Sequence, residues 1–433
     1  MTTLSSRAPG TRPSRLTRPL YAYAALGEFV LLYPLYALLF DETGLTVAQI
    51  SSLFVLWSLS SVVVSVPAGA WADVVPRRYL LAAAPLLAAC AFTLWLLWPG
   101  YWTFALGFVL WGAGGALSSG ALEALVYTEL ARRDASDRYA RVMGVTRALD
   151  VAAVGAATLL AIPVMAHGGY AAVGAASVTA CVLCALAALA LPEHRATTGG
   201  SVSADAAATA EDTEAETEEE GPSGYLDALR GGLAEARSNR RVRGAIVLVV
   251  AVTAFWGTLD EYVPLLVAES GVPTATVPVA VLVVWIFVPL GGLLAGPASR
   301  LPVRLLAVLV GLAAPAIAAG ALLGGPAGWV LIGVGFGLCQ TAGVVADARL
   351  QDRITGSSRA TVTSLAGLGT DALTTASYLL YAGVFAMTGH ALAFALFAAP
   401  YLVAALVLGH GGRGARPPRR SGLSPDRKGA AHR

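Results

Sequence analysis

Two carboxylic acids interrupt long apolar stretches of the sequence at a depth where a lipid bilayer contains little water. Glu28 lies nine residues into the stretch that begins at Pro19, and Asp371 lies eleven residues into the stretch that begins at Ala360. At about 1.5 Å per helical residue, these positions are about 14 and 16 Å deep, near the middle of a bilayer. Desolvation favours the neutral form of a carboxyl group and moves its protonation towards neutral pH. The two acids are therefore proton-coupling candidates, and a neutral structural role is the alternative.

Three further charges are expected to meet on two consecutive apolar stretches. Glu123 and Arg147 each lie about 10 Å from the same end of their predicted helices, so antiparallel neighbours would place them side by side. Asp150 follows Arg147 by three residues and shares its helix face. We predict a buried charge cluster of Glu123, Arg147 and Asp150. It is either a structural clasp or a group that acts directly in substrate binding or gating.

Asp260 and Glu261 are two adjacent acids near the far end of a later apolar stretch, which begins at Val242. Their position predicts a solvated rim at the outer mouth of the protein. A functional role at that mouth is the alternative.

The elements that must position these charges are membrane-spanning helices. Of the 433 residues, 56% are apolar and 13% are charged, whereas soluble domains are about one quarter charged. A helix crosses a bilayer with about 20 apolar residues. The sequence predicts an all-α integral membrane protein with twelve spans, at residues 19–40, 50–72, 79–98, 102–130, 142–166, 171–191, 242–267, 276–296, 302–323, 328–350, 360–388 and 391–408.

The basic residues between the predicted spans are distributed with a regular alternation. The N-terminal segment, every second loop and the C-terminal segment contain arginine, and the loops in between contain none. No signal-peptide cleavage site follows the first apolar stretch. The positive-inside rule therefore predicts a multi-pass plasma-membrane protein with both termini in the cytoplasm.

An acidic segment divides the predicted spans into six and six. Residues 205–220 hold eight acids and no base, which predicts a disordered, solvated linker. A short amphipathic helix at residues 224–241 is expected to follow it at the membrane surface. The predicted organisation is a tail at 1–18, a six-helix bundle at 19–192, an acidic linker at 193–241, a second bundle at 242–409 and a basic tail at 410–433.

The loop between the second and third spans combines one acid with two bases. We expect Gly69 to allow close approach of two helices, and Asp73 to accept hydrogen bonds from the start of a helix. Arg77 and Arg78 hold the loop at the cytoplasmic surface. We predict that Gly69, Asp73, Arg77 and Arg78 form a gating loop.

This loop, the six-plus-six division and the long central loop together resemble the major facilitator superfamily of transporters. The family signature, Gly-x-Leu-x-Asp-Arg-x-Gly-Arg-Arg, is matched at Gly69, Asp73, Arg77 and Arg78. The usual Leu, Arg and Gly are replaced by Trp71, Val74 and Pro76. Gly296 and Arg304 repeat the spacing of Gly69 and Arg77 in the second half, as internal repeats of transporters do.

The resemblance implies two six-helix bundles around a central cavity that opens alternately to the two faces. It implies that spans 1, 4, 7 and 10 line the cavity and that Asp73 helps to close its cytoplasmic side. It also selects polar and aromatic residues as substrate-cavity candidates, namely Tyr33, Tyr36, Ser118, Ser119, Trp256, Gln340 and Thr341.

The sequence lacks the residues that other classes of function would need. No Gly-x4-Gly-Lys-Ser/Thr loop occurs, and the only lysine is Lys428, so ATP is not the expected energy source. Cys181 and Cys184 have a redox-like spacing but lie in an apolar stretch without polar residues next to them. We expect no catalytic residues, no metal, no cofactor and no nucleic-acid partner. A membrane-embedded enzyme or a scaffold is a remote alternative.

The function that these observations favour is proton-coupled export of a small amphipathic organic compound by alternating access. The expected partners are this substrate, the proton and the lipid bilayer, and the expected state is a monomer. Proton-coupled uptake of a small metabolite is the alternative. Phe108 and Trp111 stand where the drug–proton antiporters of the family carry Arg and Gln, which weakens the case for drug export.

Overall fold

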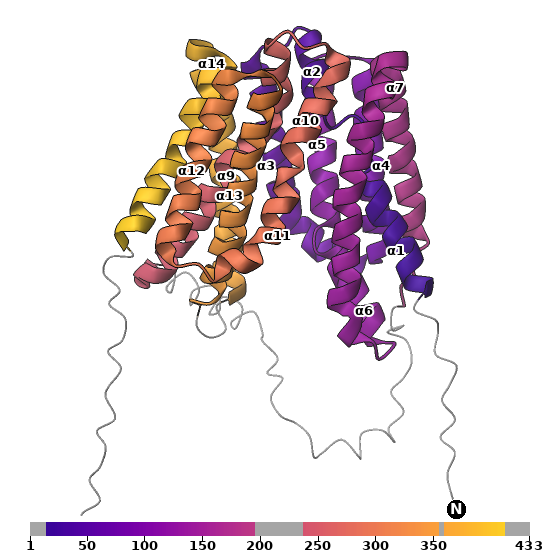
Figure 1. Cartoon of the computed structure of the whole chain (residues 1–433). Coiled ribbons are helices and arrows are strands. Elements are labelled where there is room, and N and C mark those ends of the chain that lie inside the picture. Colours follow the sequence, from indigo (N-terminus) through magenta and orange to yellow (C-terminus); the bar gives the residue numbers. More distant parts are fainter. Residues whose placement is uncertain (1–13, 195–236, 355–358, 412–433) are drawn as a thin grey trace, which may run out of the picture.

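The computed structural model describes residues 14–194, 237–354 and 359–411. Within these ranges the chain is helical and contains no strand, which confirms the all-α prediction. Figure 1 shows the helices side by side in one bundle, with the first half of the chain on one side and the second half on the other. Residues 195–236, which make up most of the predicted linker and of its amphipathic helix, and the C-terminal tail from residue 412 lie outside the described residues.

The first half consists of helices that run back and forth across the bundle. They are α1 (Ser14–Gly27), α2 (Tyr36–Glu42), α3 (Val47–Val74), α4 (Arg77–Leu97), α5 (Tyr101–Ser118), α6 (Ala121–Ala131), the 3-10 turn η1 (Ser136–Arg138) and α7 (Tyr139–Leu189). Gly169 has φ 58°, a left-handed conformation that glycine adopts at little cost, and it turns α7 back on itself. Helix α1 begins at Ser14, inside the range predicted as an N-terminal tail.

The second half follows the same plan. It consists of α9 (Arg240–Glu269), the 3-10 turn η2 (Thr274–Thr276), α10 (Val277–Trp285), α11 (Phe287–Ser299), α12 (Val303–Leu323), α13 (Gly325–Gln351) and α14 (Arg359–Gly411). Gly389, with φ 76°, turns α14 as Gly169 turns α7. Among the described residues, nine helical stretches are long and apolar enough to cross a membrane, and two of them, 54 and 50 residues long, contain these turns. This pattern is consistent with twelve spans.

Two predicted spans are interrupted by non-helical backbone. The stretch predicted as one helix at 19–40 is divided between Gly27 and Tyr36, where Pro34 supplies no backbone N–H and disfavours a helical residue before it. The stretch at 102–130 is interrupted between α5 and α6, where Gly120 has φ 72°. The stretch at 276–296 contains α10 and α11, and Ile286 between them keeps helical backbone angles, with φ −60° and ψ −27°. Non-helical backbone at membrane depth is tolerated where it is buried in protein or lines a cavity.

Close helix contacts are made by glycines other than the one predicted. A Cβ on Gly291 or Gly337 would collide with the backbone of the facing helix, so α11 and α13 approach each other closely there. A Cβ on Gly69 would have open space around it. The predicted close approach at Gly69 is therefore wrong for this conformation.

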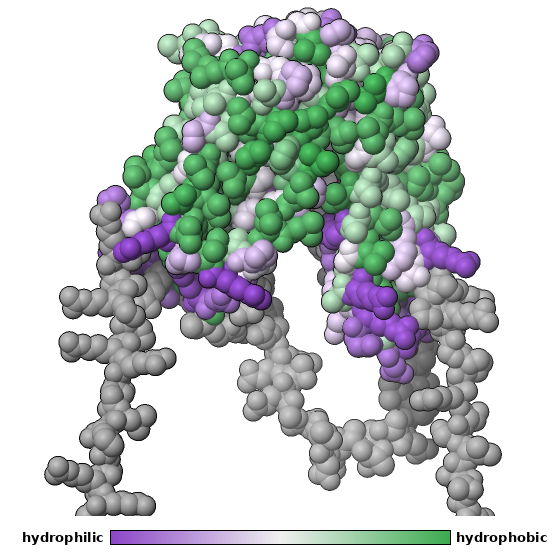
Figure 2. All heavy atoms as spheres, in the orientation of Figure 1, coloured by the Kyte–Doolittle hydropathy of each residue, from purple (hydrophilic) through white to green (hydrophobic). Residues whose placement is uncertain are grey.

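The two halves meet at one end of the bundle and part at the other. Helix α1 starts and helix α14 ends at the same end in Figure 1, which is called the terminal end below. At the opposite end, called the closed end, Glu42 accepts a hydrogen bond of 2.9 Å from Thr274 of the other half. Figure 2 shows a hollow between the halves at the terminal end and a mostly apolar surface above it.

Candidate functional site

Three pockets adjoin one another: residues of the first half alone line the first pocket, and residues of both halves line the second and third. Their volumes are about 340, 360 and 270 Å³. The first and second pockets share Glu28, Tyr33 and Trp111 as lining residues, and the second and third share Trp57 and Glu261. The three pockets are therefore parts of one central cavity, within the size range of small-molecule sites.

The first pocket forms where two interrupted spans meet. The last turn of α1 contributes Gly27, and Glu28 follows directly in the non-helical segment. Ser119 and Gly120, at the break between α5 and α6, also line this pocket. Interrupted helices expose backbone groups and helix ends to a cavity, which is how many transporters build a binding site at mid-membrane.

The predicted charge cluster is formed, but it is not buried. Arg147 lies 3.2 Å from a carboxylate oxygen of Glu123 and 3.6 Å from one of Asp150. The side chain of Arg147 is 70% exposed and that of Glu123 is 39% exposed, because both face the first pocket. The prediction of a buried cluster is therefore wrong: the cavity is open around these groups in this conformation.

The second pocket has aromatic walls and an acidic floor. Tyr33 stacks on Trp111 with ring centres 5.5 Å apart, and Trp57 lies at the same distance from Trp111 on another side. Asp260 and Glu261 line this pocket together, and the indole nitrogen of Trp285 donates a hydrogen bond of 2.7 Å to Asp260. The expectation that these two acids form a solvated rim is wrong, since both are half-buried cavity residues.

Contacts between the halves close the cavity on one side. The Tyr36 hydroxyl donates a hydrogen bond to Glu261 of the other half. Ser51 and Tyr262, both buried, join the halves through hydroxyls 2.6 Å apart. Sequence reasoning placed Tyr36 on the cavity wall but did not foresee that its partner would be Glu261.

The third pocket contains the second proton-coupling candidate. Asp371, which is exposed, lines it together with Thr374 and Glu261. Beside this pocket, the hydroxyls of Ser58 and Thr375 lie 2.7 Å apart across the two halves. Asp371 and Glu28 thus face different parts of one cavity, which the third and second pockets connect through Glu261.

The uncharged candidates have different surroundings. Ser118 and Ser119 line the first pocket. Thr341 is buried and donates to the carbonyl oxygens of Gly291 and Gly337, so its hydroxyl serves helix packing. Trp256 packs against the ring of Phe336, 5.7 Å away, and neither it nor the half-buried Gln340 lines these three pockets.

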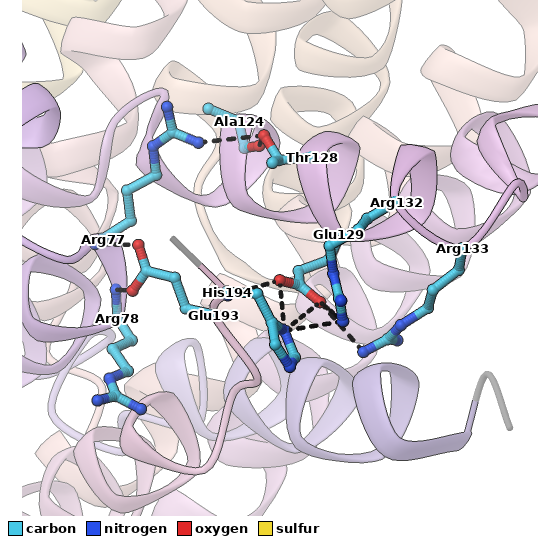
Figure 3. A network of polar contacts seen from close by, with 9 residues as sticks. All are labelled: Arg77, Arg78, Ala124, Thr128, Glu129, Arg132, Arg133, Glu193 and His194. Atoms are coloured by element: carbon cyan, nitrogen blue, oxygen red, sulfur yellow. Dashed lines mark hydrogen bonds and ion pairs between the residues drawn. The ribbon is translucent and has the colours of Figure 1, made fainter. Parts of the chain in front are cut away.

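At the terminal end, the loop between α3 and α4 is held by a residue that sequence reasoning did not select. Glu193 accepts hydrogen bonds of 2.7 and 3.0 Å from the backbone N–H groups of Arg77 and Arg78, which begin α4 (Figure 3). The partial positive charge at the N-terminal end of α4 also stabilises a carboxylate at this position. This is the capping role that we expected of Asp73, whose side chain lies outside the described part of the chain.

A second missed acid lies beside this cap. The side chain of Glu129 in α6 is only 1% exposed and lies 3.1 Å from Arg133, whose side chain is 8% exposed. His194 approaches Glu129 to 3.0 Å with a ring nitrogen, and its backbone N–H donates to the same carboxylate at 2.8 Å (Figure 3). The sequence signal was the cluster of charges around residue 132, which we interpreted only as a loop between spans.

A family model and solved structures of known proteins agree on the fold of this chain. The family model described as Major Facilitator Superfamily matches residues 19–371. No protein of curated function matches the sequence significantly. A point mutant of the nucleoside transporter NupG has a TM-score of 0.71 at 14% identity, with 90% of this chain and 98% of that chain covered.

Two further solved structures share this architecture. The POT family transporter PepTSo has a TM-score of 0.64 at 13% identity, with 93% of this chain and 98% of that chain covered. A bacterial homolog of the human lysosomal transporter Spinster, described as inward-facing and unoccupied, has a TM-score of 0.63 at 15% identity, with 93% and 96% covered. At these identities the likeness concerns the fold.

Proposed function

The chain belongs to the major facilitator superfamily, and from this membership we propose that it exports a small amphipathic organic compound in exchange for protons. It is a multi-pass membrane transporter rather than an enzyme. Proton exchange and outward direction are the specific parts of the proposal. The observation that supports proton exchange best is the central cavity, in which Glu28, Glu261 and Asp371 line the walls without an ion pair to any described residue.

The proposed cycle uses the cavity in two conformations. In the present one the halves are joined at the closed end, and substrate enters from the terminal end, which we take to be cytoplasmic. When the closed end opens, a cavity carboxyl group takes a proton from outside and the substrate leaves. A proton and a substrate that compete for the same carboxylate cannot both be bound, and this competition couples their movements.

Glu28 is the first candidate for the competed carboxylate. It lies at the break in the first span, where the first and second pockets join, so a substrate in either pocket would approach it. Asp371 is the second candidate. Glu261 is the third candidate. Its hydrogen bond from Tyr36 exists only while the closed end is shut, which links its protonation to the conformational change.

Proton-coupled uptake of a small metabolite uses the same cavity in the opposite direction and is the alternative. The D-xylose–proton symporter among the similar folds shows that this architecture serves that chemistry as well, with a TM-score of 0.62. The two functions differ in how the ligands bind: in exchange the proton and the substrate compete for the cavity, and in symport they are bound together.

The proposal is tested in right-side-out membrane vesicles with an imposed proton gradient, acid inside or acid outside. A panel of amphipathic dyes and a panel of nutrients are supplied separately, with vesicles lacking the protein as the control. Export predicts dye movement against the direction of proton flow. Nutrient accumulation together with protons, with no dye movement, would establish uptake instead.

A further inference from the structure

The charges that face the central cavity are unevenly balanced. The acidic side chains that line the three pockets are Glu28, Glu123, Asp150, Asp260, Glu261 and Asp371, and Arg147 is the basic one. Arg147 is already held by Glu123 and Asp150, at 3.2 and 3.6 Å. Among the described residues, these pockets therefore offer no unengaged cation to an anionic substrate.

The acids of the second and third pockets have mostly neutral neighbours. Glu261 accepts from the Tyr36 hydroxyl and Asp260 accepts from the Trp285 indole, and both donors are uncharged. Within the described residues, no Lys, Arg or His lies within ion-pair distance of Glu28, Asp260 or Glu261. Carboxylates in such surroundings gain stability from a proton or from a cationic ligand.

The walls around these acids also favour positive charge. Tyr33, Trp57 and Trp111 form a continuous aromatic surface on the second pocket, and the face of an aromatic ring attracts a cation. Helices α1 and α5 end at the first pocket, at Gly27 and Ser118, and α6 begins there at Ala121. The C-terminal end of a helix carries a partial negative charge and the N-terminal end a partial positive charge, so two of these three helix ends favour a cation.

From this cavity we propose that the transported compound is an organic cation with an aromatic or otherwise apolar body. The inference rests on the proposed function and names its substrate class. A cation that displaces a proton from a carboxylate exchanges one positive charge for another, so the net charge of the cavity is the same in both halves of the cycle. An anion would meet unpaired carboxylates, and a neutral compound would leave them without a counter-charge.

The test uses three probes of similar shape and different charge on the purified full chain in a non-ionic detergent. They are tetraphenylphosphonium, which is cationic, triphenylphosphine oxide, which is neutral, and tetraphenylborate, which is anionic. Binding is measured by titration calorimetry, with protein-free micelles as the reference for partitioning into detergent. We expect the phosphonium to bind at least about tenfold more tightly than either of the other probes. Equal or tighter binding of the borate or the oxide would overturn the inference.

Variants locate the binding within the cavity. Glu261→Gln and Glu28→Gln should each weaken phosphonium binding by roughly tenfold, since each removes a negative charge from low-dielectric surroundings. Asp137→Asn, which removes an exposed acid in η1, should leave binding unchanged. Unfolding temperatures show whether each variant is folded. If both folded cavity variants bind the phosphonium as the wild type does, the cavity acids do not select for charge.

A liposome experiment separates this inference from the proposed function. If a proton gradient drives a neutral or anionic solute and never the phosphonium, the cation inference fails while proton coupling stands. If the phosphonium binds selectively and exchanges across the membrane, but a proton gradient does not drive it, the cation inference stands and proton coupling fails.

Discussion

The two ends of the molecule use polar side chains in opposite ways. At the closed end, hydrogen bonds connect the first half with the second, through Tyr36 to Glu261 and between Ser51 and Tyr262. At the terminal end, Glu129 and Glu193 make their described hydrogen bonds and ion pairs within the first half. The contacts at the closed end fix the position of one half relative to the other, and the contacts at the terminal end stabilise the first half itself.

This difference separates stability from transport. Contacts within a half persist while the halves move, so their loss should reduce folding stability in every conformation. Contacts between halves exist in one conformation only, so their loss should shift the equilibrium between conformations. Substitutions at the two ends should therefore fail in different assays.

The largest expected effect is at the terminal end. Glu129→Gln removes the charge that faces Arg133, and both side chains are almost fully buried. Leaving one partner of a buried ion pair alone costs about 3–5 kcal/mol. We expect a clearly lower unfolding temperature in detergent, with Asp137→Asn as the exposed control. An unfolding temperature equal to that of the control would show that this network does not hold the half together.

At the closed end, Tyr36→Phe should change conformation rather than stability. It removes the donor to Glu261, and a hydrogen bond to a charged group contributes about 1.5–3 kcal/mol, roughly a ten- to hundredfold shift in the equilibrium. Conformation is measured by labelling a single cysteine, Gly257→Cys, in a chain whose native cysteines are replaced by alanine. Gly257 lines the third pocket and has space for a side chain.

An impermeant maleimide added from the closed side should label this cysteine faster in Tyr36→Phe. Tyr33→Phe is the matched control, since its ring lies in the same cavity and no hydrogen bond from its hydroxyl connects the halves in the described structure. Equal labelling in all three backgrounds would mean that the contact between Tyr36 and Glu261 does not hold the closed end.

A smaller effect is expected from the helix cap. Glu193→Ala leaves the first backbone N–H groups of α4 without their acceptor, and loss of a cap typically costs about 1 kcal/mol. The unfolding temperature should fall modestly, and maleimide labelling at position 257 should not change. Glu193→Gln keeps an acceptor and should be milder. A labelling change in Glu193→Ala would show that the cap takes part in the conformational equilibrium.

The smallest effect on folding is expected from the charge cluster. Because Arg147 and Glu123 are exposed to the cavity, their pair should contribute about 0–1 kcal/mol to stability. Glu123→Gln should therefore fold, while its transport rate falls if the cluster acts in gating. Adding Arg147→Gln should partly restore that rate. If the transport losses of the two single variants simply add in the double variant, the residues do not function as a pair.

The sequence predicted the features that depend on local composition. Hydropathy and alternating arginines indicated the apolar helices, and depth along the helix placed Glu28 and Asp371 near mid-membrane. The structure places both on the cavity. The interruption at Gly27 and Pro34 was not predicted, because glycine and proline are tolerated inside many membrane helices and hydropathy does not register a break.

Features that depend on contacts between distant residues could not be predicted. Glu193 and His194 lie beside α4 and α6 only after the chain has folded, and Glu261 meets Tyr36 from the other half. Depth along a straight span placed Asp260 and Glu261 near the surface. The structure places them on the cavity wall, because aromatic side chains of both halves lie around that pocket.

The central claim is that a carboxyl group in this cavity couples proton movement to substrate movement. It is tested most directly in proteoliposomes that compare proton-driven accumulation with energy-independent substrate exchange. Glu28→Gln, Glu261→Gln and Asp371→Asn each imitate a permanently protonated acid. The account predicts that at least one of them, Glu28→Gln first, abolishes accumulation and retains exchange. Accumulation at the wild-type rate in all three variants would contradict it.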